Sequence, residues 1–144
     1  MITETTMRVV DHEVAHVVLA HLLGLKVLYV TRNAPIDSGQ TCAVVRDDDK
    51  RSPQEIAFAR ATFLIGAVGF EPGIVEGKAF FCADSDVQKA QMLADAAGFS
   101  LLDASEYARD LCASETFRKL HARVTDALLH KIHLDERELS KLLR

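Results

Sequence analysis

The chain has 144 residues, of which 49% are hydrophobic and 26% charged, so it is expected to be a single domain, residues 1–144, with a substantial core. Its 17 basic and 21 acidic residues give a net charge of −4, which argues against nucleic acid as a partner. Three cysteines without a Cys-x-x-Cys spacing indicate no disulfide framework, and no apolar run is long enough for a membrane span. We therefore expect a cytoplasmic domain.

The N-terminal third of the sequence predicts a long helix followed by a β-hairpin. Apolar residues recur with helical spacing over residues 4–23, and Gly24 follows as a typical helix stop. β-Branched and aromatic residues predict short strands at 26–31 and 41–46. The residues between them include Asn, Pro, Asp, Ser and Gly, which favour a turn, so we expect the two strands to be antiparallel.

The remainder of the chain predicts helices. Ser52 is expected to cap the next helix, with Glu55 three residues later, and this helix should end in the glycine-containing segment 66–73. After a loop, another helix is expected to open near Ser85 and to end before Gly98. Three more helices are expected at 104–112, 114–130 and 135–143. The predicted fold class is mainly α (α+β), with about five helices packed around a small antiparallel β-hairpin.

The sharpest chemical feature is the run His12-Glu13-Val14-Ala15-His16 inside the first predicted helix. Residues four apart share one helical face, so both imidazoles can reach one metal ion, while Glu13 lies beside that ion. Neutral nitrogen ligands and a neighbouring carboxylate that accepts a proton from water are what a catalytic zinc site requires. Burying three polar residues unpaired in an apolar helix would be costly, so the pattern favours a metal site over core histidines.

A catalytic zinc site needs a third protein ligand, and the residues themselves leave alternatives open. His21 lies about 140° further round the helix than His16 and is expected at the surface. Three more histidines fall on the predicted C-terminal helices, where a solvated helix surface is their expected place: His121, His130 and His133. Asp84 and Asp86 flank Ser85 at a predicted helix start, where helix capping is the alternative role, and composition does not choose between them.

Four segments in chain order carry a further pattern. They are a helical His-Glu-x-x-His followed by a Val-x-x-Val-Thr strand, a glycine-rich helix end followed by Glu, a stretch related to Gly-Ala-x-Asn-Asp-Ile-x-x-Ala-Thr, and a leucine-rich C-terminal helix. These segments occupy residues 12–31, 66–71, 82–91 and 128–139. In this order they resemble the peptidase domain of the FtsH-type, ATP-dependent zinc proteases, and the resemblance covers nearly the whole chain.

The resemblance implies that Zn²⁺ is held by His12, His16 and Asp86, that Glu13 is the catalytic general base, and that Glu71 lies close to the metal as a partner of a ligand imidazole. It also implies a peptide or unfolded protein as substrate, and a ring-forming homo-oligomer. Because the 144 residues contain no Gly-x-x-x-x-Gly-Lys-Ser/Thr phosphate loop, any ATPase that unfolds substrates would be a separate partner. The edge of the predicted hairpin could hold an extended peptide.

The sequence departs from the family pattern at a few positions, among them Ala15, Val68, Pro72, Cys82 and Gln91. These changes concern substrate handling and oligomer contacts more than the metal ligands. The principal prediction is a zinc metalloendopeptidase of the His-Glu-x-x-His type. One alternative is a zinc-stabilised binding or regulatory module without turnover. Another is a different metal hydrolase, because two histidines and a carboxylate also suit non-haem iron.

Overall fold

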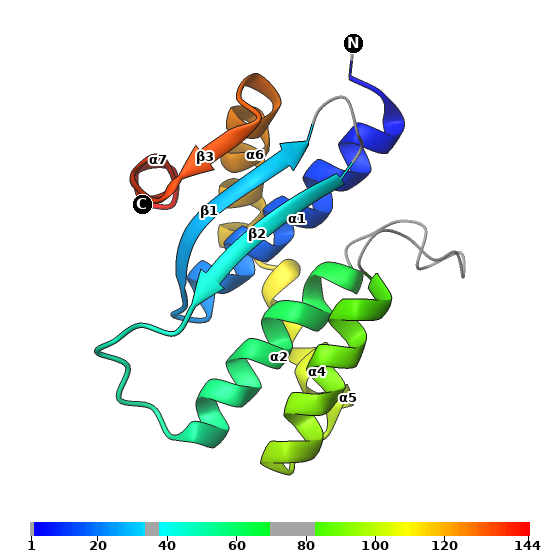
Figure 1. Cartoon of the computed structure of the whole chain (residues 1–144), viewed down its shortest axis with the longest axis vertical. Coiled ribbons are helices and arrows are strands. Elements are labelled where there is room, and N and C mark those ends of the chain that lie inside the picture. Colours follow the sequence, from blue (N-terminus) through cyan, green and yellow to red (C-terminus); the bar gives the residue numbers. More distant parts are fainter. Residues whose placement is uncertain (1, 34–37, 70–82) are drawn as a thin grey trace.

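The computed structural model describes residues 2–33, 38–69 and 83–144 (Figure 1). Over these ranges the elements are α1 Glu4–Leu22, β1 Lys26–Asn33, β2 Ser38–Val44, α2 Pro53–Gly69, α4 Ala83–Ala97, α5 Leu101–Cys112, α6 Glu115–His130, β3 His133–Asp135 and α7 Glu136–Leu142. The described part of the chain is thus mainly helical with a small antiparallel sheet, which confirms the predicted α+β class. None of its helices has the length and apolarity needed to cross a membrane.

The sheet contains the predicted hairpin and one strand that the sequence did not predict. Its order is β2-β1-β3, and both pairings are antiparallel. Val30 in the central strand lies opposite Thr41 of β2 and Leu134 of β3. The expectation that His133 lies on a helix is wrong, because Leu134 is buried beside β1 and holds these three residues as a short strand. The sheet leaves β2 as an open edge strand in the described structure.

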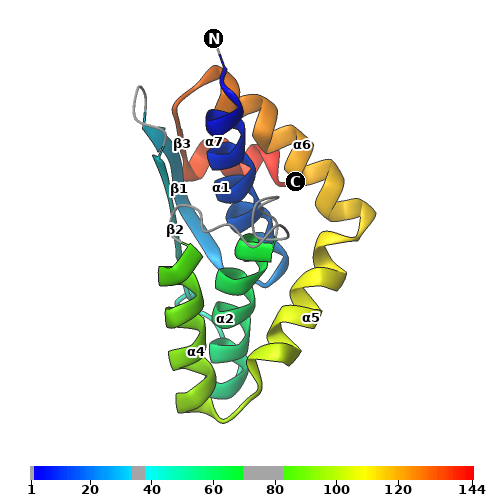
Figure 2. The same cartoon turned by 90° about the vertical axis from the view of Figure 1, so that its right-hand side faces the viewer.

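Helix α1 is the centre of the fold, as Figure 2 shows, with the sheet on one side of it and α6 on the other. It also contacts α2. Because neighbours surround it, every residue from His12 to Ala20 is buried, and not only one stripe. The predicted helix at 4–23 is therefore confirmed, and its polar residues lie in the interior of the molecule, where they need polar partners.

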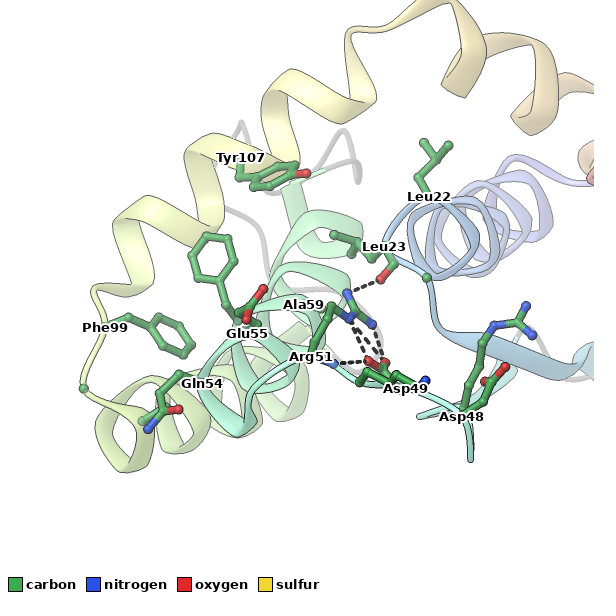
Figure 3. A pocket seen from close by; sticks show the side chains of 16 residues that line it. Leu22, Leu23, Asp48, Asp49, Arg51, Gln54, Glu55, Ala59, Phe99 and Tyr107 are labelled. Carbon is green, nitrogen blue, oxygen red and sulfur yellow. Dashed lines mark hydrogen bonds and ion pairs between the residues drawn. The ribbon is translucent and has the colours of Figure 1, made fainter.

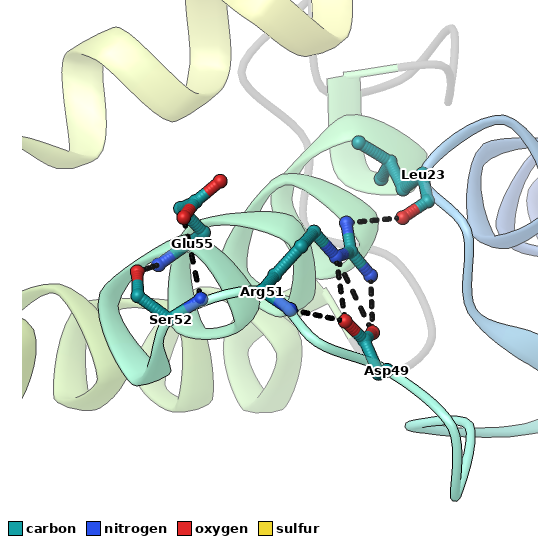
Figure 4. Close-up of polar contacts among 5 residues, drawn as sticks. All are labelled: Leu23, Asp49, Arg51, Ser52 and Glu55. Atoms are coloured by element: carbon teal, nitrogen blue, oxygen red, sulfur yellow. Dashed lines mark hydrogen bonds and ion pairs between the residues drawn. The ribbon is translucent and has the colours of Figure 1, made fainter.

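Helix α2 begins and packs as the sequence suggests. The Glu55 amide donates to Ser52 Oγ at 3.1 Å and the Ser52 amide donates to Glu55 Oε1 at 3.2 Å, which confirms the predicted capping box (Figure 4). Further along, a Cβ at Gly66 would lie 2.5 Å from Leu19 Cδ1 and 2.8 Å from Ala108 Cβ. Gly66 therefore allows α2 to approach α1 and α5 more closely than any other residue would.

Two helix starts differ from the prediction. Helix α4 begins at Ala83, so Ser85 lies inside its first turn and is not its cap; alanine is a strong helix former and extends the helix towards the N-terminus. Asp86 is consequently the fourth helical residue instead of the first. Helix α5 begins at Leu101, three residues earlier than expected, because Ser100 caps it by accepting a hydrogen bond from the amide of Leu102 at 3.2 Å.

Candidate metal centre

Helices α1 and α4 bring three side chains to one point. His16 Nε2 lies 3.1 Å from His12 Nε2 and 3.1 Å from Asp86 Oδ2, and His12 Nε2 lies 3.4 Å from the same carboxylate oxygen. All three residues are buried, with exposures of 4%, 5% and 7% for His12, His16 and Asp86. The helical spacing predicted the convergence of the two imidazoles. The family resemblance, and not the spacing, selected Asp86 from seventy residues away.

These three distances fit the ligand set of a tetrahedral metal site. Zinc bonds to nitrogen and oxygen are about 2.0–2.1 Å long, so two ligand atoms of a tetrahedral site lie about 3.3–3.4 Å apart. The three atoms here lie 3.1–3.4 Å from one another. Two imidazole nitrogens and one carboxylate oxygen are also a donor set that zinc accepts in catalytic sites, with a fourth position left for water or substrate.

The backbone of α2 fixes which nitrogen of His16 faces this point. His16 Nδ1 lies 3.2 Å from the carbonyl oxygen of Phe63, and a carbonyl can only accept, so Nδ1 carries the hydrogen. In the neutral ring, Nε2 then presents a lone pair to Asp86 Oδ2, which is itself an acceptor. Such an arrangement requires a positive charge between the two atoms. A single proton bridges only two of the three atoms, whereas a metal ion bonds to all three.

The surroundings keep Asp86 ionised, as a metal ligand must be. With a proton in that place, burial would raise the pKa of the Asp86 carboxyl group, but hydrogen bonds from His12 and His16, together with the charge of the imidazoles, outweigh burial. The result is a pKa lowered to about 2. A metal ion in the same place also carries positive charge and would likewise favour the carboxylate form.

Glu13 lies beside this cluster and is held by the hairpin. One of its carboxylate oxygens and a ring nitrogen of each histidine lie within 4.8 Å of one another. Thr41 Oγ1, from β2, lies 3.0 Å from Glu13 Oε1 and 3.1 Å from the Glu13 backbone oxygen, so its hydroxyl donates to this residue. Burial raises the pKa of the Glu13 carboxyl group, against the opposing charge of His16 and His12 and the hydrogen bond from Thr41.

A cleft of about 330 Å³ opens onto the cluster. Its walls come from α1, the β2 edge strand, α2 and α4. The β2 residues Gly39 to Ala43 lie along one side, and Phe63, Leu64 and Lys89 contribute to the helical side. The buried donor atoms are therefore reached from a groove that runs beside an open strand edge.

The other candidate residues lie apart from the cluster or outside the described part of the chain. Glu71 and the side chain of Asp84 lie outside it. His21 is exposed, as predicted. His130 ends α6 and His133 lies in β3, and both are exposed, as expected. His121 contrasts with the surface expectation: it is half-buried, and its Nε2 donates to the Asp11 backbone oxygen at 3.3 Å.

Sequence reasoning missed three contributors to the site: Thr41, Gly39 and the Phe63 carbonyl. Thr41 and Gly39 come from the hairpin, and Phe63 from the middle of α2. A backbone carbonyl leaves no trace in the residue pattern. Gly39 was part of a segment that predicts a turn, although it lies in β2. Only Thr41 could have been suspected from the sequence, because it is a polar residue on a short strand that follows the helix with His12 and His16. This indication is weak.

A larger hollow, of about 950 Å³, lies elsewhere, beside the C-terminal end of α1 (Figure 3). Asp49 and Arg51 on its wall are bonded to each other at 2.7 Å, and Arg51 also donates to the Leu23 carbonyl at 2.8 Å (Figure 4). The guanidinium of Arg51 lowers the pKa of Asp49 to about 2. Asp49 and Arg51 thus serve to tie the loop before α2 to α1. Among the described residues, no group of side chains that could bind a metal ion occurs in this hollow.

No protein-family model matches the sequence, and no curated protein matches it either.

Proposed function

We propose that this protein is a zinc-dependent metallopeptidase, which hydrolyses peptide bonds with Glu13 as general base. One observation carries the proposal: two imidazole nitrogens and a carboxylate oxygen converge to 3.1–3.4 Å, with a second carboxylate beside them and an open strand edge along the same cleft. A purely structural cluster would need neither Glu13 nor access from outside.

The residues have distinct roles in this proposal. His12, His16 and Asp86 would hold the zinc ion, and the Phe63 carbonyl would keep His16 in the tautomer that a ligand needs. A zinc ion in such a site lowers the pKa of water and polarises a carbonyl group. Glu13 would accept the proton of the attacking water and deliver it to the nitrogen of the leaving amine.

The β2 strand supports a peptide as the substrate. Its outer edge is unpaired in the described sheet, and residues 39–43 line the cleft. An extended peptide that pairs with this edge gains backbone hydrogen bonds that do not depend on its sequence. Such pairing would place the peptide backbone along the cleft in which Glu13 and the three ligand atoms lie.

The resemblance to FtsH-type peptidase domains agrees with this proposal and extends it. It favours unfolded proteins as substrates, a separate cytoplasmic ATPase as the partner that delivers them, and a homo-oligomeric ring. Each of these is a proposal that depends on the peptidase activity and can fail without removing it.

The decisive experiment compares the wild type with Glu13→Gln, which preserves shape and hydrogen bonding but removes the base. We expect both proteins to bind about one zinc per chain and to melt within a few degrees of each other. Cleavage of casein or of a peptide library by the variant should be at least about 10²-fold slower, the lower end of what general-base catalysis contributes. Equal cleavage by both proteins would contradict the assignment of Glu13. Full zinc without any cleavage by the wild type, with or without an added ATPase partner, would instead support the binding module.

A further inference from the structure

A second hollow, of about 610 Å³, adjoins the metal cleft. The two share Ala43 of β2, Phe63 and Leu64 of α2, and Lys89 of α4, so one ligand can occupy both. Its remaining lining is largely apolar and includes the end of β2 and one face of α4. At its rim Met92 is 70% exposed and Val44 is 40% exposed, which leaves apolar surface in water.

The two helices contribute the same pattern to this hollow. Arg60 on α2 is followed three and four residues later by Phe63 and Leu64. Lys89 on α4 is followed three and four residues later by Met92 and Leu93. Because residues at this spacing share a helical face, each helix presents one cation beside a pair of apolar side chains.

The charge of the hollow is one-sided. Among the described residues, two cations, Arg60 and Lys89, line it and no carboxylate does, in a chain whose net charge is −4. Both side chains are exposed, and neither forms an ion pair with another residue in the described part of the chain. Lys89 also lines the metal cleft, one helical turn from the ligand Asp86. An occupant with negative charge next to an apolar group would complement both features.

We propose that this hollow is a specificity subsite, in which the peptide held at the metal centre places an apolar side chain while Lys89 and Arg60 bind an acidic side chain nearby. The inference rests on the proposed function and names its substrate class. In an extended peptide, alternate side chains point to the same side and are about 7 Å apart. The acidic residue is therefore expected two positions from the apolar one.

The test measures binding separately from cleavage. Three fluorescein-labelled peptides are compared: Ala-Glu-Ala-Leu-Ala-Glu-Ala and its versions with Gln or Lys in place of Glu. Binding is measured by fluorescence anisotropy to zinc-loaded Glu13→Gln protein, so that the peptides stay intact. We expect the Glu peptide to bind at least about tenfold more tightly than the Gln peptide, and added salt to reduce this difference.

Two variants in the same background assign the effect. Lys89→Glu should reverse the preference, so that the Lys peptide becomes the tightest ligand. Lys119→Glu, which makes the same charge change on exposed α6, should leave the order unchanged. Equal dissociation constants for the three peptides, or an unchanged order in Lys89→Glu, would overturn the inference.

The outcome is distinguishable from failure of the peptidase proposal. If the wild type cleaves all three peptides at the same rate and binding is also independent of peptide charge, the peptidase proposal is supported and the subsite proposal is wrong. If charge-dependent binding occurs but the wild type cleaves none of the peptides, the hollow is supported as a peptide-binding site and the peptidase proposal is wrong.

Discussion

Gly39 leaves the space that the Glu13 side chain occupies. A Cβ at Gly39 would lie 2.7 Å from Glu13 Cγ and 3.0 Å from Glu13 Oε2, and 2.9 Å from the backbone oxygen of Thr31. Thr41, two residues further along the same strand, donates to the other carboxylate oxygen, Oε1. The edge strand therefore positions both oxygens of Glu13, one through a hydrogen bond and one through the absence of a side chain.

The first prediction concerns Gly39→Ala. The added methyl group cannot displace the Thr31 backbone easily, so it should push the Glu13 carboxylate out of place. Zinc should remain at about one per chain, while peptidase activity should fall by about 10–10²-fold, since a small misplacement of a catalytic group is costly. Ser38→Ala, one residue earlier on the strand, is the control and should retain activity. An active Gly39→Ala would show that the position of Glu13 does not matter.

The second prediction concerns the metal ligands. His12→Ala, His16→Ala and Asp86→Ala should each reduce bound zinc well below one per chain, because each removes one of three converging donor atoms. Asp84→Ala should keep its zinc, and elemental analysis measures the difference. If Asp86→Ala retained full zinc and Asp84→Ala lost it, the assignment of the third ligand would be wrong by two residues. Retention in both would point to Glu71.

The sequence predicted the parts of this fold that depend on local pattern. The 4–23 helix and the Ser52 cap follow from spacing and capping chemistry, and both are confirmed. The short β3 strand was missed because its pairing depends on Leu134 packing beside β1, which no local pattern records. The early start of α5 was missed because its segment contains several polar residues that could cap a helix, and the sequence alone does not show that Ser100 is the one that does.

The same division applies to the metal centre. A spacing of four placed His12 and His16 together, because that relation lies within one helix. Asp86 comes from a distant helix, and the residues alone left it equivalent to Asp84. What decides between them is how α4 packs on α2 and how α2 in turn packs on α1, where Gly66 allows a close approach to Leu19. Long-range packing of this kind is not readable from one sequence.

The third prediction concerns Arg51, which ties the loop after β2 to the end of α1. Its guanidinium donates to the Leu23 carbonyl and to both oxygens of Asp49. Arg51→Ala should lower the melting temperature by a few degrees and leave zinc binding unchanged, because the metal centre lies elsewhere on α1. Asp49→Asn, which retains the bond to Leu23, should cost less. Lys50→Ala is the matched control, and a loss of stability equal to that of Arg51→Ala would contradict the assignment.

The last prediction is a pH dependence of stability that comes from His121. In its neutral form both ring nitrogens have partners: Nε2 donates to the Asp11 backbone oxygen at 3.3 Å, and Nδ1 accepts from Thr125 Oγ1 at 3.4 Å. Burial lowers the pKa of His121 below its ordinary value of 6.5. The hydrogen bond to the Asp11 backbone and the negative charge of the Asp11 side chain oppose this effect but do not outweigh it. The unfolded chain therefore binds this proton more readily than the folded protein does.

The sign follows from that difference. The contribution of His121 to stability is fully present above pH 6.5 and is lost as the pH falls below this value towards the lowered pKa of the folded protein. His121→Gln can still donate to Asp11 but does not titrate, so its stability should fall less between about pH 7.5 and about pH 5.5 than that of the wild type. Denaturant unfolding at several pH values measures this. His21, whose pKa burial also lowers, is present in both proteins, so its effect cancels in the comparison. An unchanged slope in His121→Gln would show that His121 titrates alike in the folded and unfolded chains.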